Sequence, residues 1–97
     1  MTRVYISGPM SGLPQLNFPA FHAKAQELRA QGIDVVNPAE HDEAPGLPWT
    51  TYMRKDIRLL VDCDAIYMLP GWMRSRGALL EHHIAGELGF KIMGSAA

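Results

Sequence analysis

Segments typical of β-strands alternate with segments typical of helices along the whole chain. Four short, mostly apolar segments have strand-like composition, and they cover residues 4–7, 33–36, 65–69 and 91–93. Between them, apolar residues recur at helical spacing over about residues 18–31, 49–61 and 76–88. This order predicts an α/β fold in which a small parallel sheet of about four strands and three helices are joined by right-handed crossovers. Because no repeat or linker interrupts the pattern, we expect residues 1–97 to form one domain.

Glycine and proline mark the connections between these segments. The predicted loops cover residues 8–14, 39–48 and 70–74, the second of them acidic, and residues 94–97 are expected to form a frayed tail. Asn17 and Ser75 are candidate N-caps, and Gly32 and Gly89 follow the predicted ends of two helices. Ligands of open parallel sheets bind outside the carboxyl ends of the strands. The loops after the first and third strands are therefore the expected ligand loops.

The composition excludes several classes of protein. Nine basic and ten acidic residues give a net charge of −1, which argues against a binder of polymeric nucleic acid. With 47% hydrophobic residues the chain is too apolar for a disordered protein, and its single cysteine favours a reducing compartment. No apolar run is long enough to span a membrane, and we see no signal-peptide pattern. We expect a small cytoplasmic domain without membrane contact, whose modest core a partner subunit would complete.

The second predicted helix carries a carboxylate on its apolar side. At about 100° per residue its polar side groups Arg54, Lys55, Arg58 and Asp62, and its apolar side groups Met53, Ile57, Leu60 and Val61. Asp56 falls on the apolar side, nearly opposite the basic residues. Burying a carboxylate costs several kcal/mol unless a partner satisfies it. Asp56 is therefore a candidate functional residue, with a structural hydrogen bond or a mis-phased helix as the alternative.

The third predicted helix repeats this anomaly. Leu80, Ile84 and Leu88 make an apolar line, and Glu81 stands one residue away, in line with Ala85. Glu81 also lies in the early part of the helix, where free N–H groups and the helix dipole favour an anion. Glu81 is a second candidate, with the same structural alternatives as Asp56.

The turn Ser75-Arg76-Gly77 opens the third helix and is able to bind a phosphate with its backbone N–H groups. Arg74 and Arg76 flank the turn and would add charge-assisted hydrogen bonds. Simple helix capping by Ser75 and solvated arginines are the alternatives, since Ser is common at helix starts.

Tyr5 and Trp72 lie near the edge of the sheet where ligands are expected, and each has two possible roles. The Tyr5 hydroxyl either contacts a substrate or sits at the rim of the core. Trp72, in the loop after the third strand, either stacks on a base or packs, and Trp49 is a packing candidate.

Standard nucleotide and metal motifs are absent from the sequence. It contains no Walker P-loop, G-x-G-x-x-G, H-E-x-x-H, Cys-x-x-Cys or Gly-x-Ser-x-Gly motif. His82 and His83 are adjacent and so point to different sides of a helix, which prevents both from binding one metal. Cys63 is expected to be a small core residue. We predict no metal site.

Three motifs together resemble those of the nucleoside 2-deoxyribosyltransferase superfamily, and within it the short DUF4406 branch, which is common in bacteria and phages. They are the opening segment 4–12 with its Tyr-x-x-Gly, the segment Arg54-Lys55-Asp56, and Ser75-x-Gly77-x-x-x-Glu81. The resemblance spans about residues 3–93. It implies a flavodoxin-like (Rossmann-like) three-layer fold and a homodimer or higher homo-oligomer.

The resemblance also implies an activity, the cleavage of the N-glycosidic bond of a (deoxy)nucleoside or nucleoside 5′-monophosphate. Glu81 matches the catalytic glutamate that attacks the anomeric carbon of the sugar. Asp56 matches the aspartate that binds the sugar or assists the glutamate, and Tyr5 matches a tyrosine near both. Water as acceptor gives hydrolysis and a second base gives transfer; no metal or organic cofactor is required.

Substrate-binding residues follow from the same resemblance. Ser75 and Gly77 match the turn that binds the 5′-phosphate, and Gly8 and Met10 match the loop that lines the base pocket. Phosphate-binding relatives carry Ser and Arg in the first loop, where this chain has Pro9 and Ser11, so phosphate binding would rest on the turn and its flanking arginines. The full set expected to contact substrate is Gly8, Pro9, Met10, Ser11, Trp72, Ser75 and Gly77.

Three functions remain open on these grounds. The first is an N-glycosidase or glycosyltransferase with Asp56 and Glu81 facing one cleft. The alternative is a non-catalytic nucleotide-binding or regulatory module that uses the same cleft. The third is a structural subunit, in which the two carboxylates lie far apart with no pocket between them.

Overall fold

Four parallel strands form the centre of the molecule. The computed structural model describes residues 2–41 and 46–97. Its strands are β1 (Arg3–Ser7), β2 (Asp34–Val36), β3 (Ala65–Met68) and β4 (Lys91–Gly94), arranged in the order β2-β1-β3-β4. All three neighbouring pairs are parallel, and β1 lies between β2 and β3 with Tyr5 opposite Val36 and Ile66. The chain thus leaves β1 toward one edge of the sheet and later returns to its other side, which makes the carboxyl end of β1 the switch point.

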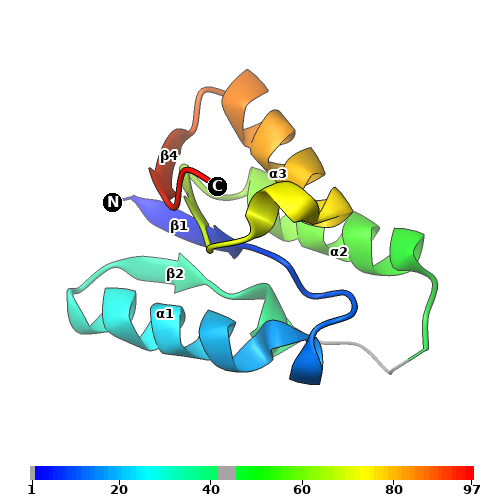
Figure 1. Ribbon diagram of the computed structural model, residues 1–97. Coiled ribbons are helices and arrows are strands. Elements are labelled where there is room, and N and C mark those ends of the chain that lie inside the picture. The colour runs from blue at the N-terminus through cyan, green and yellow to red at the C-terminus, as the bar shows by residue number, and fades with distance from the viewer. Residues whose placement is uncertain (1, 42–45) are drawn as a thin grey trace.

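Helices cover both faces of this sheet, which gives three layers (Figure 1). Helix α1 (Phe18–Ala30) packs on one face through Phe21, Ala25 and Leu28. Helices α2 (Trp49–Val61) and α3 (Arg76–Glu87) lie on the other face. The predicted α/β fold is confirmed, and its layers match those of a flavodoxin-like fold.

The two faces of β1 belong to different cores because side chains alternate along a strand. Val4 and Ile6 pack with α1, whereas Tyr5 packs with Leu60 of α2 and Ala85 of α3. Ser7 follows Tyr5 by two residues and is also buried. Strand β1 therefore presents two buried hydroxyl groups, those of Tyr5 and Ser7, on the face that meets α2 and α3.

Short 3₁₀ turns stand where loops were expected. They are η1 (Pro14–Asn17), η2 (Pro38–His41) and η3 (Trp72–Arg74). In η1, Asn17 takes the predicted N-cap position of α1 with a left-handed backbone, but its side chain makes no cap bond and donates instead to the Pro9 carbonyl at 2.9 Å. The rest of the predicted acidic loop, residues 42–45, lies outside the described residues.

Three details of the sequence prediction are wrong. Leu80 and Leu88 are exposed, and α3 buries Ala78, Glu81 and Ala85 instead, because small side chains allow the helix to approach the sheet closely. Val61 is likewise exposed although it was expected on the apolar side of α2. The end of the chain is not frayed: Ser95 N–H donates to the Met68 carbonyl at 2.8 Å, and Gly71 N–H donates to the Ala97 carbonyl at 3.1 Å.

None of the helices in the described ranges has the length and apolar character needed to cross a bilayer.

Candidate functional site

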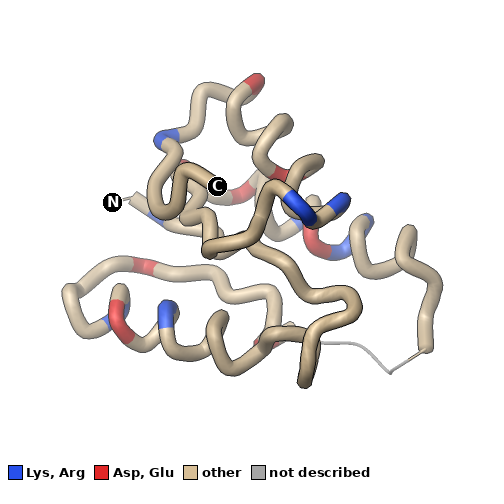
Figure 2. Tube along the Cα trace, viewed as in Figure 1, with Lys and Arg blue, Asp and Glu red and all other residues tan. Residues whose placement is uncertain are grey.

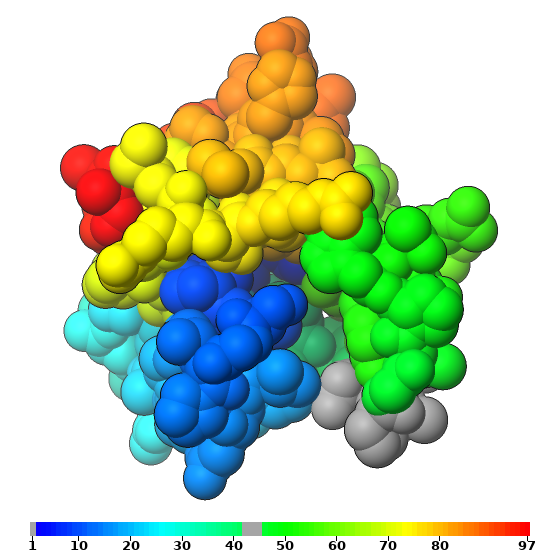
Figure 3. All heavy atoms as spheres, turned by 45° about the vertical axis from the view of Figure 1, so that its right-hand side comes forward, coloured from blue at the N-terminus to red at the C-terminus, as the bar shows by residue number. Residues whose placement is uncertain are grey.

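A cavity of about 620 Å³ opens at the carboxyl end of β1. The surface is hollowed between the segment after β1, the start of α3 and helix α2 (Figure 3). One wall comes from the loop after β1 and the start of α1, and the opposite wall comes from the first turns of α2 and α3. The cavity therefore lies where ligands bind in open parallel sheets.

Glu81 forms the buried end of this cavity. It lies on the inner side of α3 between Ala78 and Ala85, and only 5% of its surface is exposed. Its carboxylate accepts two hydrogen bonds from β1: Tyr5 Oη donates to Oε2 at 2.5 Å and Ser7 Oγ donates to Oε1 at 2.6 Å. Both donors are themselves buried. The carboxylate is thus held by neutral hydroxyl groups rather than by a cation.

This environment changes the proton affinity of the two groups. The pKa of Glu81 is raised to about 7, mainly by burial; the hydrogen bonds from Ser7 and Tyr5 oppose this rise, and the nearby Asp56 carboxylate adds to it. Burial, followed by the charge of Glu81, holds the pKa of Tyr5 well above its ordinary value of 10. Tyr5 therefore stays a proton donor, while Glu81 changes its charge near neutral pH. A carboxyl with such a pKa in a cavity is typical of a functional site.

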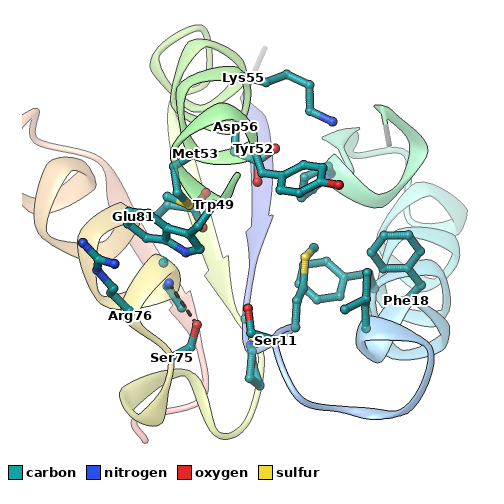
Figure 4. Close-up of a pocket in the computed structure, with 18 of the residues that line it drawn as sticks. Ser11, Phe18, Trp49, Tyr52, Met53, Lys55, Asp56, Ser75, Arg76 and Glu81 are labelled. Carbon is teal, nitrogen blue, oxygen red and sulfur yellow. Dashed lines mark hydrogen bonds between the residues drawn. The ribbon is translucent and has the colours of Figure 1, made fainter. Parts of the chain in front are cut away.

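Asp56 lines the same cavity from α2 (Figure 4). It is half-buried, and its charge acts on both Glu81 and Tyr5. Its neighbour Lys55 also lines the cavity and donates a hydrogen bond to the His41 carbonyl. The structure thus brings Tyr5, Asp56 and Glu81 to one cavity from three different elements, which is not the arrangement expected of a purely structural subunit.

The turn that opens α3 contributes the polar rim. Ser75 Oγ accepts a hydrogen bond from Ala78 N–H at 3.2 Å, so this serine is the N-cap that the sequence predicts. Ser75 and Gly77 both line the cavity. A Cβ at Gly77 would lie 3.0 Å from Met53 Sδ, so this glycine also lets α3 pack closely against α2.

Basic side chains gather near this rim. Arg74 and Arg76 line the cavity beside the turn. Figure 2 shows basic residues at the start of α3 and on helix α2. The Arg76 guanidinium lies 3.8 Å from the centre of the Trp49 indole, a cation–π contact that joins the starts of α2 and α3.

The loop after β1 forms the other wall through Gly8, Pro9, Met10 and Ser11. A Cβ at Gly8 would lie 2.7 Å from Leu69 Cβ, which is too close for any other residue without movement. Gly8 is therefore required for the chain to leave β1 against the end of β3. The glycine of the Tyr-x-x-Gly motif thus serves the packing of β1 against β3 and also lines the cavity.

Trp72 does not line the cavity, in contrast to the other residues expected to contact substrate. Its indole stacks on His82 with ring centres 4.3 Å apart, and its Nε1 donates to the Ser95 carbonyl at 2.9 Å. Only 6% of Trp72 is exposed. The expectation that it stacks on a base is corrected: Trp72 fixes the end of the chain against α3.

Several residues of the site were not predicted from the sequence. Phe18, Trp49 and Tyr52 bring aromatic surface to the cavity. Ser7 does not line the cavity but donates a hydrogen bond to Glu81. Ser7 carried a signal, because it stands two residues after Tyr5 and a strand places such residues on one face. The aromatic residues carried none, since they resemble ordinary core positions.

Among the described residues, no group of three or more His, Cys, Asp or Glu side chains is placed to hold a metal ion. The sequence model of a family described as "Domain of unknown function (DUF4406)" matches residues 2–94. No curated protein matches the chain.

Proposed function

The chain belongs to the DUF4406 family, and we propose that it cleaves the N-glycosidic bond of a deoxynucleoside or a nucleoside 5′-monophosphate with Glu81 as the nucleophile. The observation that carries this proposal is the Glu81 carboxylate itself. It forms the buried end of a cavity of about 620 Å³, two hydroxyl groups orient it, and a second carboxylate lies in the same cavity. The resemblance of the three motifs to deoxyribosyltransferases agrees with this placement.

Cleavage of an N-glycosidic bond develops positive charge on the sugar ring. A carboxylate beside the anomeric carbon stabilises that charge and then forms a covalent bond to the carbon. In the proposed first step, Glu81 attacks this carbon, the bond to the base breaks, and the base leaves with the electron pair and takes up a proton from water. In the second step water or another base attacks the same carbon and loses a proton to the solvent, and the bond from the carbon to Glu81 breaks, which releases the carboxylate. Asp56 is proposed to bind a sugar hydroxyl.

The two walls of the cavity suit the two ends of such a substrate. The wall next to α1 is apolar and aromatic, with Met10, Phe18 and Phe21, and is proposed to hold the base. The wall at the start of α3 offers the cap turn with Arg74 and Arg76, and is proposed to hold a 5′-phosphate. Figure 4 shows the labelled Phe18 and Arg76 on opposite sides of the cavity.

A substrate panel distinguishes this enzyme from a non-catalytic nucleotide-binding module. The protein is incubated with the four common deoxynucleosides and their 5′-monophosphates, free base is measured by chromatography, and binding is measured by thermal shift. We expect base release from at least one compound, lost in Glu81→Gln but retained in Glu87→Gln, which changes an exposed glutamate of the same helix. Thermal stabilisation without base release would favour the binding module.

We also propose that the protein acts as a homodimer or higher homo-oligomer in the cytoplasm. Support for self-association comes from exposed apolar side chains on α2, on α3 and the residue that follows it, and on β4, namely Val61, Leu79, Leu80, Leu88 and Ile92, each at least 36% exposed. Light scattering coupled to gel filtration tests the oligomeric state.

A further inference from the structure

Ser7 is the hydrogen-bond partner of Glu81 to which the resemblance assigns no role. Its hydroxyl donates to Glu81 Oε1 at 2.6 Å, and Ser7 is 1% exposed. Ser7 is also absent from the described residues that line the cavity, whereas Tyr5 and Glu81 both line it. Any effect of Ser7 on a bound substrate must therefore pass through the carboxylate.

We propose that Ser7 is a positioning residue that fixes the plane of the Glu81 carboxylate and favours its ionised form. This inference rests on the proposed function, because it concerns the geometry of the nucleophile. Tyr5 alone holds one oxygen, Oε2, and so restrains rotation about the last side-chain bond at one point only. This torsion is intrinsically broad for glutamate. A second donor on Oε1 removes that freedom.

The position of the Ser7 hydroxyl is itself fixed by the sheet. Ser7 is the last residue of β1 and is opposite Met68 of β3, and its carbonyl accepts a hydrogen bond from Leu69 N–H at 2.8 Å. Gly8, directly after it, is held against Leu69. A donor mounted on a central strand orients its partner more closely than one on a loop.

Replacing Ser7 by alanine adds or removes no charge near Glu81. Tyr5 faces it from β1, and Asp56 faces it from α2. Lys55, Arg74 and Arg76 line the same cavity. A difference between wild type and a Ser7 variant therefore reports the lost hydroxyl and not a new charge.

Titration of Glu81 in Ser7→Ala tests the inference without any substrate. The five glutamates are labelled with ¹³C at the carboxyl carbon, and Glu81→Gln assigns the signal. A hydrogen bond to a charged group stabilises that form, so we expect the pKa of Glu81 to rise by about one unit in Ser7→Ala. Ile6→Val, a mild core change that faces α1 on the same strand, should leave the pKa unchanged. Ser7→Cys, which keeps the size with a weaker donor, should give an intermediate rise.

Kinetics on a base-releasing substrate supply the second readout. Ser7→Ala should lower kcat with KM unchanged, by about tenfold near pH 6 and by less at pH 9, since a higher pKa leaves less ionised Glu81 at low pH. An unmoved Glu81 titration in both Ser7 variants would overturn the inference. If the titration moves as expected and no compound releases base, Ser7 still positions Glu81 while the proposed function fails.

Discussion

Replacing Glu81 by glutamine should change how the stability of the protein depends on pH. Glu81 has an ordinary pKa of 4.5, which burial raises to about 7 in the folded protein. The folded state therefore binds the Glu81 proton more tightly than the unfolded state. The resulting stabilisation is fully present below pH 4.5 and is lost as the pH rises through 7. Glutamine has no proton to lose, so Glu81→Gln lacks this dependence.

The magnitude follows from the difference between the two pKa values. Between pH 5 and pH 9, wild type should lose about 2–3 kcal/mol of unfolding free energy relative to Glu81→Gln. Any constant cost of the glutamine, such as a weaker hydrogen bond to Tyr5, is the same at both pH values and cancels. Titrating groups that do not interact with Glu81 are present in both proteins and cancel as well.

Urea unfolding followed by circular dichroism measures this difference at several pH values and one protein concentration. Glu87→Gln serves as the matched control, because Glu87 is exposed on the same helix. Its stability should follow wild type at every pH. Parallel curves for wild type and Glu81→Gln would refute the reasoning, because they would show that Glu81 titrates as an ordinary exposed glutamate.

Three further substitutions test individual contacts. Tyr5→Phe removes the hydroxyl that donates to Glu81 and should raise the pKa of that carboxyl, measured by ¹³C titration; an unchanged pKa would rule out the contact. Gly8→Ala places a Cβ 2.7 Å from Leu69 Cβ and should lower the unfolding free energy by about 1–3 kcal/mol in urea, whereas wild-type stability would contradict the close packing. Trp72→Phe loses the hydrogen bond to the Ser95 carbonyl and should lower the unfolding free energy by about 1 kcal/mol. Its affinity for nucleoside monophosphates, measured by calorimetry, should be unchanged. Weaker binding would show that Trp72 contacts the ligand after all.

Most of the architecture was predictable because each element carries its own local signal. Helix α2 covers the predicted residues 49–61, since a proline-rich loop ends directly before it and apolar spacing runs through it. Helix α3 was placed correctly, but its buried side was not. Two apolar stripes compete on α3, and periodicity does not tell which one meets the sheet. The buried stripe is the one that contains the small residues Ala78 and Ala85, which let the helix approach the sheet closely.

The candidate site was predictable to the extent that polar residues broke an apolar pattern. Asp56 and Glu81 stood out for this reason, and the structure brings both to one cavity. Ser7 did not stand out, because a serine at the end of a strand is also a common start of a loop. The prediction for Trp72 was wrong because the sequence does not tell which way a tryptophan side chain in a loop points. Its orientation is set by the contacts with His82 and Ser95, which lie elsewhere in the chain.

Trapping of the sugar on the protein tests most directly whether Glu81 is a nucleophile. A nucleoside that releases its base in the substrate panel is replaced by its 2′-fluoro arabino analogue, since an electron-withdrawing fluorine destabilises the oxocarbenium-like transition state and so slows breakdown of the glycosyl–enzyme bond. The intact protein is weighed by mass spectrometry, and its peptides are then mapped. We expect one added sugar, or sugar phosphate, on the peptide that contains Glu81, and none in Glu81→Gln. A sugar attached to another residue, or base release that persists in Glu81→Gln, would contradict the proposed role of Glu81.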